Sequence, residues 1–177
     1  MTSPIQVEPV RLLVGAIYQP EGAPLDKARS LLESVYGPVE AVSPTWPFDL
    51  SDYYDAEMGS GLERIFWSFA RPIPPETLPV LKQAVAAVER ELRPPGAPRA
   101  VNLDPMLLDH QKIVLASFKG AGQKLYLGNG VWADFVLRFH KGSWKHFDWT
   151  FPDFRDTRYH AFLTQVRDRY LRERARI

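Results

Sequence analysis

Two short segments are apolar on both faces when written as extended strands, and they constrain the fold more than any other feature. The first is Val10–Tyr18 (V-R-L-L-V-G-A-I-Y), where one set of alternate positions is apolar and Leu13 and Ile17 help fill the other face. The second is Arg64–Ala70, which reads R-I-F-W-S-F-A. A strand that is covered on both faces lies inside a sheet rather than at its edge. Both segments are therefore predicted to be central strands.

Amphipathic helices alternate with these strands. Apolar residues recur at helical spacing in Leu25–Tyr36, and again in a helix that Pro74-Pro75 opens and that runs to about Leu92, because proline suits the first helical turn. Val39–Val42 begins a short strand that the prolines after it confine to a sheet edge. With one more strand near residues 99–103, the order is β-α-β-β-α-β. This is the ferredoxin-like order, in which the first and third strands are central.

The rest of the chain predicts antiparallel hairpins and a closing helix. Further strands are expected near residues 112–118, 125–127, 131–139 and 144–151, and the last helix over 155–174. The break at residues 93–98 separates the first part of the βαββαβ unit, residues 1–98, from a β-rich extension over 99–177. We expect one α+β domain over residues 1–177: a ferredoxin-like βαββαβ core extended by antiparallel β-hairpins and a C-terminal helix.

Composition and charge exclude several classes of protein. With a net charge of +1, the chain has no overall electrostatic attraction to nucleic acids or membrane surfaces. The chain has no cysteine, which excludes disulfides, thiolate metal sites and cysteine nucleophiles. No apolar run approaches the roughly 20 residues that cross a bilayer, and the N-terminus lacks a signal pattern. We expect a soluble, cytoplasmic protein with no membrane partner.

An acidic stretch in the first half is the candidate metal site. No Lys or Arg lies between Ser30 and Glu63, and carboxylates collect there on a loop. Oxygen ligands of this kind suit a hard divalent cation such as Mg²⁺, and Asp49, Asp52 and Glu57 are the predicted ligands. Their spacing differs from the calcium-loop pattern. The alternative is a solvated loop in which Asp49 or Asp52 caps a short helical turn.

The tetrapeptide N-L-D-P at residues 102–105 is a second candidate. Because the residue before proline avoids the helical region, we expect the Asp104 carboxylate to lie at a turn. The same tetrapeptide occurs in one class of GTPases, which also need a phosphate loop of the form G-x-x-x-x-G-K-[ST]. The nearest segment here, Gly120–Lys124 (G-A-G-Q-K), has no following Ser or Thr and precedes a strand. We therefore interpret it as a flexible hairpin turn and exclude a P-loop nucleotide hydrolase.

Basic residues of the second half, with carboxylates nearby in the sequence, form a third candidate. A basic pocket with neighbouring carboxylates suits a phosphorylated or carboxylated ligand. Asp153 is also expected to cap the closing helix. His140 and His146 straddle a predicted hairpin turn, but no third metal ligand has a matching spacing. Together with the second candidate, the predicted ligand-binding residues are Asn102, Asp104, Lys119, Lys124 and Asp153.

Three functions fit these patterns. The first is binding, with or without metal-assisted turnover, of a small anionic or phosphorylated ligand, with a divalent cation as the implied cofactor. The second is RNA binding through the arginine-rich closing helix, although the chain lacks the aromatic RNP-type strand motif. The third is a structural or partner-binding role, with Trp46 and Tyr53-Tyr54 as the interaction patch. None of the patterns assigns a catalytic reaction.

Several segments together resemble one family. They include P-V-R-L-L-V-G-A-I-Y, P-F-D-L-S-D-Y-Y-D-A-E-M-G, V-N-L-D-P, K-L-Y-L-G-N-G-V-W-A-D and W-T-F-P-D-F-R. On these motifs the chain is similar to the uncharacterised bacterial family called domain of unknown function 4416, over nearly its whole length. Where that family often has glycine after N-L-D-P, this chain has Met106. The resemblance implies a single domain and implies no activity.

Overall fold

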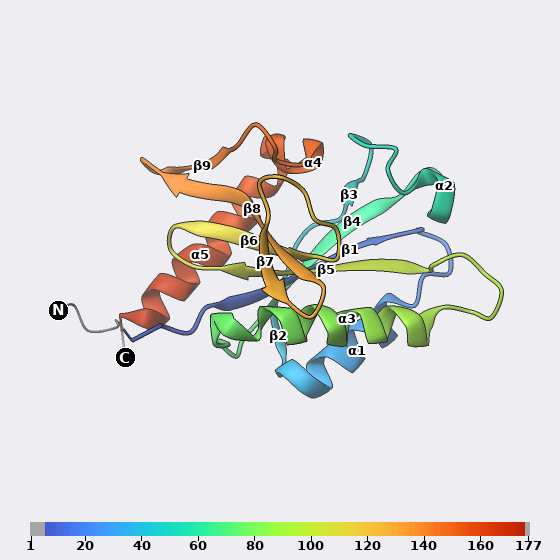
Figure 1. Ribbon diagram of the computed structural model, residues 1–177, viewed down its shortest axis with the longest axis horizontal. Coiled ribbons are helices and arrows are strands. Elements are labelled where there is room, and N and C mark those ends of the chain that lie inside the picture. Colours follow the sequence, from blue (N-terminus) through green and yellow to red (C-terminus); the bar gives the residue numbers. More distant parts are fainter. Residues whose placement is uncertain (1–5, 176–177) are drawn as a thin grey trace.

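Figure 1 shows the protein as a computed structural model that describes residues 6–175. The first half contains β1 (Arg11–Tyr18), α1 (Leu25–Tyr36), β2 (Val39–Val42), β3 (Trp46–Pro47), α2 (Asp55–Met58), β4 (Glu63–Phe69) and α3 (Leu78–Leu92). The second half contains β5 (Val101–Leu108), β6 (Lys112–Ser117), β7 (Leu125–Gly128), β8 (Val131–His140), β9 (Ser143–His146), α4 (Pro152–Arg155) and α5 (His160–Arg174). Short 3₁₀ turns precede α3 and α5, at Pro75–Thr77 and Thr157–Tyr159.

The strands of the described region form one antiparallel sheet. Its order is β2-β4-β1-β5-β6-β8-β7, while β3 also pairs with β4 and β9 also pairs with β8. The first four positions, β2-β4-β1-β5, have the strand order of a ferredoxin-like unit, with its first and third strands, β1 and β4, in the middle. The predicted α+β fold is confirmed, and β6 to β9 extend the sheet beyond β5.

Helices cover both faces of the sheet (Figure 1). Alternate β1 residues such as Leu12 and Val14 pack with α1 and α3, and the intervening Leu13 packs in a second core with α5. Gly15 lies on the α5 face, where an added Cβ would stand 2.9 Å from Cε1 of Phe66. The Phe66 ring therefore packs directly on the β1 backbone, and only glycine leaves room for it. These two cores explain why β1 and β4 are apolar on both faces.

Two predictions about the extent of strands are wrong. Asp104 does not lie at a turn, because β5 continues through Asp104 and Pro105 to Leu108. The extended conformation that proline imposes on the preceding residue suits a strand as well as a turn. The strand expected over 144–151 ends at His146. There Thr150 Oγ1 accepts a hydrogen bond from Phe147 N at 2.8 Å and closes a turn, which leaves Trp149 41% exposed.

The C-terminal helix is confirmed, although it begins later than expected, at His160. The predicted inner stripe is buried, at Tyr159 in the 3₁₀ turn before the helix and at Phe162, Leu163, Val166 and Tyr170 in the helix itself. The prediction that Asp153 caps this helix is wrong, because Asp153 lies in α4, is buried and pairs with an arginine of β4. None of the helices in residues 6–175 is long and apolar enough to cross a membrane.

Candidate functional site

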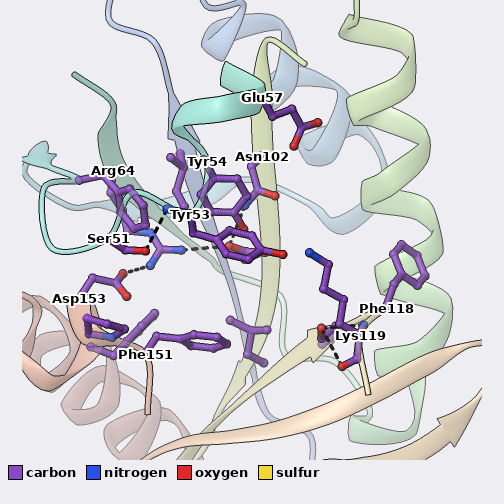
Figure 2. A pocket seen from close by; sticks show the side chains of 18 of the residues that line it. Ser51, Tyr53, Tyr54, Glu57, Arg64, Asn102, Phe118, Lys119, Phe151 and Asp153 are labelled. Atoms are coloured by element: carbon purple, nitrogen blue, oxygen red, sulfur yellow. Dashed lines mark hydrogen bonds and ion pairs between the residues drawn. The ribbon is translucent and has the colours of Figure 1, made fainter. Parts of the chain in front are cut away.

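A pocket of about 660 Å³ opens where β5 and β6 separate. The two strands pair only between Met106–Leu108 and Ile113–Leu115. Pro105, which has no N–H group to donate, immediately precedes Met106, the last residue of β5 that pairs with β6. Beyond it, side chains of both strands line the pocket, and Lys82 reaches it from α3. The remaining walls come from the segment around α2, the β6–β7 loop and the start of α4 (Figure 2).

The base of the pocket is a buried network of charges centred on Arg64. Its Nη2 donates to Asp104 Oδ2 at 3.0 Å, and its Nη1 donates to Asp153 Oδ2. Asp104 Oδ2 also accepts a hydrogen bond from Asn102 Nδ2 at 2.8 Å, and Asp153 Oδ2 accepts one from Tyr159 Oη at 3.3 Å. Strands β4 and β5 and helix α4 thus meet at one guanidinium group.

Aromatic rings enclose the same guanidinium. Its Cζ lies 5.5, 5.2 and 5.1 Å from the ring centroids of Phe48, Phe66 and Phe154. Burial is the largest single influence and would lower the pKa of Arg64, but the combined effect of the surrounding groups, Asp153 foremost, outweighs it and the pKa is raised. Arg64 therefore stays charged and holds the two carboxylates in place.

A second buried cation, Lys82, stands beside this network. Its Nζ donates to the backbone oxygen of Leu103 at 3.2 Å and lies 3.8 Å from Asp104 Oδ1, which is too long for a hydrogen bond. A lysine ammonium has three N–H donors. Within residues 6–175 only one of them has a hydrogen-bond acceptor. Lys82 therefore has N–H groups left for a ligand in the pocket.

Glu89 supports this wall from α3. It accepts a hydrogen bond from Leu103 N and lies 3.5 Å from Arg99 Nη1. Burial raises the pKa of Glu89, against the opposing effects of the Leu103 N–H and of the nearby cations Lys82 and Arg99. The glutamate thus anchors the first residues of β5 to α3.

The mouth of the pocket is formed by two tyrosines and a lysine. Lys119 Nζ lies 4.4 Å from the centroid of the exposed Tyr53 ring, and Figure 2 shows the lysine extending toward that ring from the opposite wall. Behind it, burial and the charge of Asp104 raise the pKa of Tyr54, which keeps the phenol neutral. In residues 6–175, Lys119 has no carboxylate within ion-pair distance. Its charge is the least compensated in the pocket.

Two further cations of the wall are already paired. Lys124 Nζ lies 3.2 Å from Asp134 Oδ2 and donates to Ser117 Oγ at 3.3 Å. Arg99 bridges Glu57, at 2.8 Å, and Glu89. Both cations still contribute positive potential to the pocket, but each is already paired with a carboxylate within the protein.

The structure brings the predicted ligand-binding residues together. Asn102, Asp104, Lys119, Lys124 and Asp153 come from three separate parts of the chain, and all line this pocket. Sequence reasoning missed Arg64, Lys82 and Arg99. Lys82 carried a detectable signal, because it stands on the apolar stripe of α3, between Leu81 and Val85, which are both buried. A lysine in that stripe either pairs in the interior or faces a cavity.

The predicted metal ligands do not meet at one point. Asp49 and Asp52 line a separate hollow beside α2, whereas Glu57 lines the main pocket. Asp49 pairs with Arg158 at 2.8 Å, and Glu57 pairs with Arg99. Across residues 6–175, no group of three or more His, Asp or Glu side chains is placed to hold a metal ion.

The residues behind the other two hypotheses have structural partners. On α5, Arg169 contacts Glu40, and Arg174 contacts Glu8. Arg167 donates to the backbone oxygen of His110 at 2.7 Å and lies over the ring of Phe139. Trp46 packs against the core rings of Phe66 and Tyr159 instead of forming a surface patch. Tyr53 and Tyr54 belong to the pocket wall.

Comparison with known proteins identifies the family. No curated protein and no solved structure matches the chain. One family pattern matches residues 8–170, which covers β1 through most of α5 and therefore every wall of the pocket. The chain belongs to the family described as domain of unknown function (DUF4416).

Proposed function

We propose that this protein binds a small anionic compound, of which a phosphate ester is the best match, in the pocket between β5 and β6. The observation that carries the proposal is the pair of ammonium groups of Lys82 and Lys119. Lys82 has N–H groups without an acceptor, and Lys119 has no carboxylate partner within residues 6–175. A ligand anion supplies the missing acceptors.

The size and lining of the pocket support a ligand of small-molecule size. A volume of about 660 Å³ falls within the range of small-molecule sites. Tyr53, Phe118 and Phe151 provide apolar surface next to the cations. An anion held by lysines beside aromatic rings is partly shielded from solvent, which strengthens its attraction to the cations. The proposal assigns binding only, without a catalytic step.

The other hypotheses have less support. An anion site formed by Lys82 and Lys119 does not require the predicted divalent cation, whose carboxylate ligands lie in two different hollows. RNA binding relied on the arginines of α5, and Arg167, Arg169 and Arg174 are engaged in contacts within the protein. The pocket is the feature that these alternatives leave unexplained.

Isothermal titration calorimetry with phosphate esters at low ionic strength tests the proposal. Lys119→Met removes the ammonium and keeps most of the side-chain length. Loss of one charged hydrogen bond of about 1.5–3 kcal/mol should weaken binding by roughly 10- to 150-fold. The matched control is Lys145→Met, an exposed lysine of β9 that does not line the pocket. Equal affinities for the Lys119 and Lys145 variants, or no binding of any phosphate ester, would refute the proposal.

A further inference from the structure

The carboxylates at the base of the pocket each have one oxygen without a hydrogen bond. Both bonds to Asp104 end on Oδ2, from Arg64 and Asn102. Both bonds to Asp153 also end on Oδ2, from Arg64 and Tyr159. No group in residues 6–175 donates to Oδ1 of either residue, and neither Oδ1 atom is sealed from solvent. The base therefore presents two carboxylate oxygens that receive no hydrogen bond from the described residues, one of which, Asp104 Oδ1, lies 3.8 Å from Lys82 Nζ.

One guanidinium fixes the positions of these acceptors. Asp104 and Asp153 bind neighbouring nitrogens of Arg64, so the carboxylates stand on two sides of one rigid planar group. Both side chains are at most about one-eighth exposed, at 12% and 5%. A carboxylate oxygen accepts hydrogen bonds and cannot donate them when ionised. Groups that enter this end of the pocket must therefore be donors, such as hydroxyl groups.

The opposite end has the reverse chemistry. Lys119 presents donors and positive charge there, and the Ser117 hydroxyl accepts a hydrogen bond from the Lys119 backbone N–H at 3.0 Å. Lys82 lies closer to the base, since its Nζ is 3.8 Å from Asp104 Oδ1. Because the acceptor end and the cationic end belong to one pocket, a ligand that satisfies both carries an anion on one side and hydroxyl groups on the other. Apolar walls between them, such as Phe151, match the C–H faces of a sugar or polyol.

We infer that the ligand is a phosphorylated polyol or sugar, whose hydroxyl groups donate to Asp104 Oδ1 and Asp153 Oδ1 while Lys82 and Lys119 hold its phosphate. This inference rests on the proposed function, since it places the anion at the same two lysines. It adds that the base of the pocket selects for hydroxyl groups. A simple alkyl phosphate would leave both carboxylate oxygens without a donor and would bind more weakly.

The test compares esters that differ only in their hydroxyl groups. Ribose 5-phosphate, glycerol 3-phosphate and glucose 6-phosphate are titrated beside butyl phosphate and inorganic phosphate, with calorimetric detection. At least one hydroxylated ester should bind about tenfold more tightly than butyl phosphate, as expected for one hydrogen bond to a charged acceptor. If butyl phosphate binds as tightly as all three, the inference is overturned and the proposed function stands. If no phosphate compound binds, both are overturned.

Asp104→Asn separates the two ends of the pocket in one protein. This substitution keeps a side chain of the same shape and replaces the ionised acceptor with a neutral amide. The variant should lose the preference for the hydroxylated ester, so that the ratio of the two dissociation constants falls to about one. Butyl phosphate should still bind, at least as tightly as to wild type, because a negative charge 3.8 Å from Lys82 Nζ is removed, and this binding shows that the pocket is folded. Lys119→Met should weaken both esters by the same factor. Retention of the hydroxyl preference by Asp104→Asn would assign the selectivity to other residues and overturn the inference.

Discussion

Replacing Arg64 by methionine should be among the most damaging single changes in this protein. Methionine fills much of the same volume but removes the charge that pairs with Asp104 and Asp153. The arginine side chain is 3% exposed, and it also lies within 5.5 Å of three aromatic ring centroids. The variant keeps two buried carboxylates and loses the cation that compensates them.

The size of the effect follows from the pairing geometry. Removing one partner of a buried ion pair costs about 3–5 kcal/mol, because an uncompensated charge remains in the interior. A typical domain has a free energy of unfolding of roughly 5–15 kcal/mol, so the loss is a large fraction of the total. With a urea m-value of about 2 kcal/mol/M, the midpoint of unfolding should fall by roughly 1.5–2.5 M.

Equilibrium urea unfolding, followed by tryptophan fluorescence, measures this change. The matched control is Arg158→Met, which breaks the more exposed pair with Asp49, at 2.8 Å. A pair of that kind contributes about 1 kcal/mol or less. A double-mutant cycle with Asp153→Asn should show a coupling of roughly 1–3 kcal/mol, because the pair is in direct contact. The reasoning is refuted if Arg64→Met and Arg158→Met cost the same, or if the cycle is additive.

Two further changes test the pocket walls. Gly120→Ala places a Cβ 2.9 Å from the Trp132 ring, so it should lower the melting temperature, whereas Gly122→Ala, with open space around it, should be neutral or slightly stabilising. Equal melting temperatures for the two variants would show that the Gly120 contact is unimportant. Because burial raises the pKa of Glu89, the unfolded chain releases that proton first, and the carboxyl reduces stability as the pH rises above about 4.3. The free energy of unfolding of Glu89→Gln relative to wild type should therefore increase from pH 4 to pH 7, as measured by urea unfolding. A relative decrease over this range would contradict burial as the cause of the raised pKa.

The arrangement of the core strands was predictable because burial on two faces leaves a direct mark on the sequence. Val10–Tyr18 and Arg64–Ala70 are apolar at both sets of alternate positions, and the structure places them as β1 and β4, with strands on both sides. The apolar stripes of α3 and α5 were equally predictable, since each helix buries one face. A pattern that depends on one buried face and a fixed period can be recognised in the sequence without knowledge of the tertiary structure.

The conformation at Asp104 could not be predicted in the same way. A residue before proline is compatible with both a turn and a strand, and only pairing with β1 decides between them. Arg64 could not be predicted as a pocket residue for a different reason. It is the first residue of an apolar run, a position that usually faces solvent, and its two partners lie 40 and 89 residues away in the sequence. Long-range pairing of this kind leaves no periodic signal.

The buried charges also bear on function, because stability alone does not require them. Well-packed neutral side chains often replace a buried ion network at little or no cost. The triple variant Arg64→Met, Asp104→Asn, Asp153→Asn removes all three charges and keeps oxygen acceptors for Asn102 and Tyr159. It should therefore recover most of the stability lost in Arg64→Met, and should bind ribose 5-phosphate no better than butyl phosphate. Recovery of stability with loss of that selectivity would show that the network serves the ligand rather than the fold. A triple variant that stays as unstable as Arg64→Met would show instead that the charges are needed for folding.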